Sequence, residues 1–149
     1  MTTRPTSVRL AVALAVLAGS VGVAQADDAA ALAAAAKEKG AVVSPSGIVF
    51  KSIKAGSGAS PKATDTVKVN YRGTFPNGQE FDASHDGPIS FPLNRVIPCW
   101  TEGVQKLKVG GKAKLTCPSA TAYGPGGAGG GAIPPNATLI FEVELLAIN

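Results

Sequence analysis

The residues that could perform covalent or metal chemistry are few. The chain has one histidine, His85, in a polar loop, and two cysteines, Cys99 and Cys117. No G-x-S-x-G sequence accompanies the histidine, so a hydrolase triad is not predicted. One histidine and two cysteines are too few ligands for a zinc site. The glycine-rich segments 109–112 and 124–131 lack the Lys-Ser/Thr ending of a phosphate-binding loop, so we expect neither a metal nor a cofactor.

A second group of residues is aromatic and aliphatic. The chain has only one Trp, two Tyr and five Phe, so their positions are informative. Phe81 precedes Asp82, and Trp100 follows Val96 and Ile97 closely. Aromatic residues in strands and helices usually pack in the core. Taken alone, these residues, together with Tyr71, Tyr123 and Phe141, therefore predict core packing.

The elements that carry these residues are mainly predicted strands. Segments 66–72 and 139–148 alternate between apolar and polar residues, as half-buried strands do. The Pro-Asn-Gly sequence after Phe75 predicts a hairpin, in which 71–75 folds back onto 79–82. Two further strands are expected, at 48–53 and 112–117.

One segment has a helical period instead. Trp100, Val104 and Leu107 recur at the spacing of one helix face. Pro98 suits the first helical turn, and the two glycines at 110–111 can end the helix. A single short helix among antiparallel strands predicts an α+β fold, with a twisted antiparallel sheet in the form of a half-barrel wrapped around that helix.

The first 26 residues have the pattern of a secretory signal. Arg4 and Arg9 form a positive start, residues 10–23 are apolar or small, and Ala24-Gln25-Ala26 is a small-x-small cleavage sequence. The alternative is a retained anchor, but the apolar run of about 14 residues is shorter than the roughly 20 needed to span a bilayer. We expect export with cleavage before Asp27, and no membrane contact afterwards.

The remaining chain divides into a lead-in, 27–43, and one domain, 44–149. Residues 27–39 are rich in alanine and predict a short helix, whose one large apolar residue is Leu32. That helix offers too little surface for a standard interface of roughly 800 Å² per partner, which predicts a monomer. The formal net charge is +4 and no basic stripe is present, so nucleic acid is not an expected partner.

A series of short motifs runs through residues 44–149. In order, they are YRG at 71–73, NGQEFDAS at 77–84, VIPCWTEG at 96–103, VGGKAKL at 109–115, AYG at 122–124, IPPNATL at 133–139 and FEVELL at 141–146. This series closely resembles the FKBP-type peptidyl-prolyl cis–trans isomerase domain, over the whole of the expected domain. Together with the signal sequence, it resembles the bacterial periplasmic branch of that family.

The resemblance implies a proline pocket and assigns its parts. Trp100 would form the floor, and Tyr123 and the backbone N–H of Ile97 would bind substrate carbonyls. Asp82 would lie against the twisting carbonyl and hold Tyr71 through a hydrogen bond. The walls would be Tyr71, Phe81, Val96, Ile97, Ile133 and Phe141.

Three positions depart from the family pattern. Ile89 stands where an aromatic residue is common, and Phe91 could supply that wall instead. The basic residue that commonly pairs with the aspartate has no clear counterpart, which leaves Arg72 or His85 as candidates for Asp82. The glycine-rich loop 124–131 replaces a more featured loop over the pocket.

The implied activity is cis–trans isomerisation of X-Pro bonds in exported or unfolded proteins, and macrolide ligands are possible binders of such a pocket. A non-catalytic periplasmic chaperone, or holdase, remains the alternative. If the helix lies across the sheet as the resemblance implies, Cys99 and Cys117 could meet. An exported chain favours a disulfide between them, although two buried free thiols remain the other reading.

Overall fold

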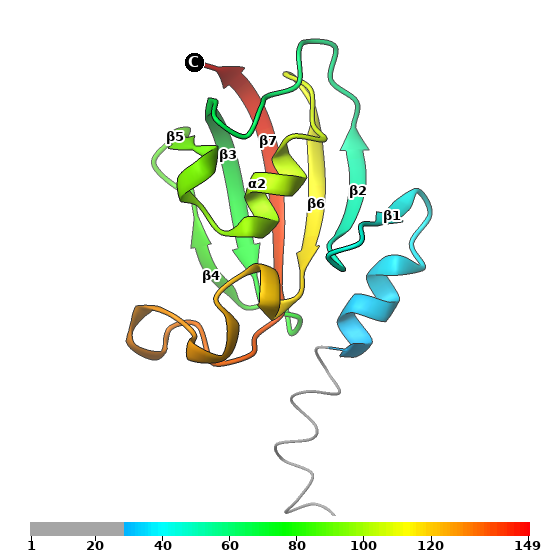
Figure 1. Cartoon of the computed structure of the whole chain (residues 1–149), viewed down its shortest axis with the longest axis vertical. Coiled ribbons are helices and arrows are strands. Elements are labelled where there is room, and N and C mark those ends of the chain that lie inside the picture. The colour runs from blue at the N-terminus through cyan, green and yellow to red at the C-terminus, as the bar shows by residue number, and fades with distance from the viewer. Residues whose placement is uncertain (1–28) are drawn as a thin grey trace, which may run out of the picture.

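The computed structural model describes residues 29–149, and these form one antiparallel sheet with two helical segments (Figure 1). The expected signal sequence lies outside the described residues. The sheet order is β1-β2-β6-β7-β3-β4, and β5 also pairs with β3. The strands are β1 (Ala41–Val43), β2 (Val49–Lys54), β3 (Thr66–Thr74), β4 (Glu80–Ala83), β5 (Ile89–Pro92), β6 (Lys112–Cys117) and β7 (Leu139–Ile148).

The centre of the sheet follows the alternation of the sequence. Along β7, Leu139, Phe141, Val143 and Leu145 are buried, whereas the residues between them are partly exposed. Strands β6 and β3 flank β7, and their inward residues complete one core layer. The predicted strands 66–72, 112–117 and 139–148 and the hairpin are therefore confirmed, with β3 extending to Thr74.

Helix α2 (Pro98–Val104) lies across one face of the sheet, in front of β3, β7 and β6 (Figure 1). Pro98 occupies its first turn, as expected. The helix ends earlier than the two glycines at 110–111, yet Leu107 beyond it is still buried because a turn bonds its N–H to Val104 O at 3.0 Å. The helical spacing thus identified the buried face, although the last turn is not α-helical.

The lead-in was expected to hold one short helix, over residues 27–39. Residues 29–36 are helical, but residues 41–43 form β1, which pairs with β2 at the edge of the sheet. The sheet therefore begins before residue 44, where the domain was expected to start. Strand β5 was also not expected, because it is short and ends in Pro92.

A disulfide joins Cys99 of α2 to Cys117 of β6, with their Cα atoms 5.8 Å apart. Both residues are completely buried. The bond ties the helix to the sheet on which it lies. Within residues 29–149, no helix combines the length and the apolar character needed to cross a membrane.

Candidate functional site

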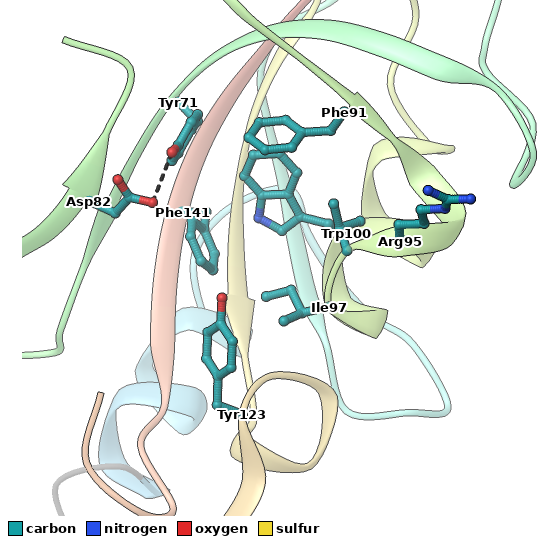
Figure 2. Close-up of a pocket in the computed structure, with 9 residues that line it drawn as sticks. Tyr71, Asp82, Phe91, Arg95, Ile97, Trp100, Tyr123 and Phe141 are labelled. Carbon is teal, nitrogen blue, oxygen red and sulfur yellow. Dashed lines mark hydrogen bonds between the residues drawn. The ribbon is translucent and has the colours of Figure 1, made fainter. Parts of the chain in front are cut away.

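The site is built around the side chain of Trp100, which α2 places over the concave face of the sheet. Trp100 is only 4% exposed. Three aromatic rings stand edge-on to its indole: Tyr71, Phe91 and Phe141, with centroids at 5.1, 5.4 and 5.5 Å and interplanar angles of 83°, 83° and 86°. Aromatic pairs favour such edge-to-face contacts. The result is an apolar floor with upright aromatic walls (Figure 2).

Each wall comes from a different strand, and the sheet order brings them together. Tyr71 lies on β3, Phe91 on the β5 strand beside it, and Phe141 on β7 at the other side of β3. Phe91 also contacts Tyr71, with ring centroids at 5.8 Å. It therefore supplies a wall, whereas Ile89 is 38% exposed and does not line the pocket.

A hydrogen bond links the aromatic wall to the carboxylate at its edge. The Tyr71 hydroxyl donates to Oδ2 of Asp82 at 2.8 Å, and the N–H of Ala83 donates to Oδ1 at 2.9 Å. Burial raises the pKa of the Tyr71 phenol, and the hydrogen bond to Asp82 and its charge raise it further. Tyr71 therefore remains a neutral hydrogen-bond donor, and Asp82 is held in one orientation.

The expected basic partner of Asp82 is not found at either candidate position. Arg72 Nε contacts Oε1 of Glu80 at 2.9 Å, and His85 Nε2 contacts Oε2 of the same carboxylate at 2.7 Å. The hydrogen bonds from Arg72 and His85 lower the pKa of Glu80. The expectation was wrong because Arg72 points to the opposite face of β3 from Tyr71, where Glu80 lies within reach.

Polar groups at the mouth of the pocket are available to a ligand. In the described part of the chain, the N–H of Ile97 has no backbone or side-chain acceptor. Tyr123 is 41% exposed, and Figure 2 shows its hydroxyl directed toward the space beside Ile97 and Phe141. Trp100 Nε1, by contrast, is buried below the mouth on the Phe141 side of the indole, and it has no acceptor in residues 29–149.

The cavity has a volume of about 440 Å³, which is within the usual range for small-ligand sites. Seven of the nine residues expected at the site line it: Tyr71, Asp82, Val96, Ile97, Trp100, Tyr123 and Phe141. The other two are placed behind the wall. Phe81 packs on Phe141, with centroids at 5.6 Å, and Ile133 is buried in the core cluster.

One residue of the lining, Arg95, was not anticipated from the sequence. It ends the short 3₁₀ turn η1 (Leu93–Arg95), just before the V-I-P-C-W motif. An exposed arginine in a turn is not part of the apolar repeat of a helix or a strand, so the sequence pattern does not single it out. The only available signal was its position beside the motif that carries the pocket floor.

The fold and the pocket define a domain in which a half-wrapped sheet and one helix line an aromatic cavity. The family described as FKBP-type peptidyl-prolyl cis–trans isomerase matches residues 58–146. The FKBP-type peptidyl-prolyl cis–trans isomerase FkpA of Aeromonas hydrophila is 56% identical over 119 residues, which are 78% of this chain and 44% of that protein. FkpA of Escherichia coli K12 is 52% identical over 115 residues, 76% of this chain and 42% of that protein.

The fold is also similar to solved structures of such proteins. The crystal structure of FkpA from Escherichia coli superposes with a TM-score of 0.82 at 42% identity, covering 98% of this chain and 69% of that chain. This chain belongs to the FKBP-type peptidyl-prolyl cis–trans isomerase family. It spans less than half the length of the two curated FkpA relatives named above.

Proposed function

We propose that this protein catalyses the cis–trans isomerisation of X-Pro peptide bonds in exported or unfolded proteins, using the pocket over Trp100. The uncatalysed barrier is roughly 18–20 kcal/mol, and it arises because rotation removes amide resonance. No covalent bond breaks, so the reaction requires no nucleophile. What it requires is an environment that favours the twisted amide over the planar one.

An aromatic cavity with a buried floor can supply that environment. The planar amide carries partial negative charge on its carbonyl oxygen, which water stabilises. A cavity whose floor is 4% exposed and whose walls are aromatic rings excludes that water, and so favours the less polar twisted amide. Each tenfold in rate needs about 1.4 kcal/mol of preferential stabilisation of the transition state, so several modest contributions suffice.

The polar groups at the mouth then orient the substrate. In our proposal the proline ring rests on Trp100, and the free N–H of Ile97 and the hydroxyl of Tyr123 bind carbonyl oxygens of the chain. The carboxylate of Asp82, held by Tyr71, lies against the rotating carbonyl. The observation that carries the proposal is the Trp100 floor surrounded by three edge-on rings, with the Tyr71–Asp82 hydrogen bond at its rim.

The site of action and the assembly state are part of the same proposal. The signal pattern of the first 26 residues favours the periplasm, where unfolded exported chains are the available substrates. We propose a monomer, because the described lead-in has only residues 29–36 in a helix. Light scattering at micromolar concentration tests whether the protein is a monomer.

Macrolides are proposed as ligands of the same cavity, since a proline-like ring could occupy it.

Exchange spectroscopy by NMR on a short X-Pro peptide tests the activity without a coupling enzyme. The wild-type protein should accelerate exchange at a small molar fraction of the peptide. Asp82→Ala should lower kcat/KM about tenfold, which corresponds to roughly 1.4 kcal/mol. Asp86→Ala is the matched control, because this exposed loop residue makes no described side-chain contact. An unaffected Asp82→Ala variant would remove Asp82 from the mechanism, and an inactive wild type would refute the activity.

A further inference from the structure

A second, shallower groove lies beside the proline pocket, along the outer side of α2. It has a volume of about 490 Å³, and apolar and polar groups both line it: Asn94, Val96, Pro98, Thr101, Glu102 and Gln105. Val96 lines both the groove and the proline pocket. The two depressions therefore lie on either side of one residue, and an extended chain that passes over Val96 can reach from the pocket to the groove.

Arg95 belongs to the pocket, and its two neighbours in the chain, Asn94 and Val96, belong to the groove. Its backbone is fixed, because Leu93 in the same turn is completely buried and its carbonyl accepts from Thr101 Oγ1 at 2.5 Å. The side chain extends away from the aromatic rings, on the other side of Trp100 from Asp82 (Figure 2).

The guanidinium of Arg95 is not neutralised within the described part of the chain. It makes no ion pair or side-chain hydrogen bond there, and Glu102 in the adjoining groove accepts from Ser46 Oγ at 2.8 Å. Hydrogen bonds from Ser44 and Ser46 and the charge of Lys106 lower the pKa of Glu102. Arginine stays protonated at every accessible pH, and its planar fork matches a carboxylate.

We infer that the groove binds the substrate chain beside the proline, and that Arg95, at the pocket and not in the groove, selects an acidic side chain close to the proline. This inference rests on the proposed isomerase function. The amide groups of Asn94 and Gln105 can bond to an extended backbone in the groove. Gln105 Nε2 already donates to Thr101 O at 2.6 Å, which leaves its oxygen as an acceptor.

A peptide series measured by NMR exchange tests the inference. Alanine, aspartate or lysine is placed at each of the three positions on either side of the X-Pro pair. For at least one position, the wild-type protein should give kcat/KM about two- to fivefold higher with aspartate than with lysine, the range expected for an exposed ion pair. Arg95→Gln should remove this ratio, and Arg95→Glu should reverse it. Added salt should weaken it.

Lys62→Gln is the matched control, because it removes the same charge from an exposed residue that lines none of the described pockets, and it should keep the wild-type ratio. The inference is overturned if every position gives a ratio near one, or if the ratio persists in Arg95→Gln. Failure of the wild-type protein on all peptides would instead refute the isomerase function. The two failures are therefore distinguishable.

Discussion

The hydroxyl of Tyr71 and the carboxylate of Asp82 are joined at 2.8 Å across the β3–β4 pair, with the phenol as the donor. This contact gives the pocket one neutral donor and one carboxylate of fixed orientation. The pKa of Tyr71 is raised by burial first and by Asp82 second. Titration of this phenol therefore reports on its burial and on its contact with Asp82.

The pKa of a tyrosine in an unfolded chain is about 10. We expect the pKa of Tyr71 in the folded protein to lie well above that value. The chain has two tyrosines, so ultraviolet titration of Tyr123→Phe observes Tyr71 alone. Adding Asp82→Asn should lower the pKa of Tyr71 without restoring the unfolded value, because burial remains. A normal tyrosine titration in the single variant would contradict the burial of Tyr71 and its hydrogen bond to Asp82.

The same shift has a consequence for stability at high pH. Because the folded-state pKa of Tyr71 lies above its unfolded value, the stability it contributes is fully present below about pH 10 and is lost as pH rises toward the folded-state pKa. Tyr71→Phe should flatten this part of the pH–stability profile, measured by urea denaturation.

The absence of a side chain at Gly73 leaves room for the rings of Phe81 and Phe141. In the β3 register it lies opposite both Phe141 and Asp82. A Cβ there would come within 2.6 Å of Phe81 Cζ and 2.9 Å of Phe141 Cε1. Gly73→Ala should cost about 1–3 kcal/mol of stability and lower isomerase activity, since Phe141 must move. Gly126→Ala is the control, because its Cβ would meet nothing within 4 Å. Equal stability and activity in both variants would contradict this packing.

The Cys99–Cys117 bond is expected to stabilise the domain through the position of α2. It closes a loop with a sequence separation of 18, worth about 3 kcal/mol in the chain-entropy model. The double Cys→Ala variant should unfold at lower urea concentration yet remain active when folded. Mass spectrometry after alkylation of the native, non-reduced protein provides the direct check. Two alkylated thiols would refute the bond.

Glu38, in the turn after helix 29–36, holds two lysines on the outer face of the sheet. Its oxygens contact Lys51 Nζ at 3.0 Å and Lys114 Nζ at 2.6 Å, and those two lysines are direct cross-strand neighbours. Glu38→Gln should cost about 0.5–1 kcal/mol at low salt and less at high salt. Glu144→Gln, which removes no described ion pair, is the control, and an equal loss in both would contradict a specific role for Glu38.

Hydrogen bonds from Lys114 and Lys51 lower the pKa of Glu38. The stability from this carboxylate is therefore present above its unfolded pKa of about 4.3 and is lost as pH falls through the folded-state value. Urea denaturation between pH 7 and pH 3 measures this loss.

The parts of the fold that the sequence predicted are those with a periodic pattern. Strand β7 was predicted because its alternate residues meet one core layer, and Trp100 because it lies on the buried face of a helix. The sequence offered the wrong basic partners for Asp82, because two residues that are near in sequence can point to opposite faces of a strand. Arg95 was missed because an exposed turn residue is positioned by tertiary contacts alone.

The measurement that tests the central claim most directly is the refolding of a protein whose slow phase is limited by an X-Pro bond. Uncatalysed isomerisation takes 10–100 s or so at 25 °C, so acceleration is easily resolved. We predict that a substoichiometric amount of the wild-type protein accelerates the slow phase, and that Asp82→Ala accelerates it much less. A holdase would instead leave the slow phase unchanged or retard it in proportion to its concentration. That result would contradict the isomerase function.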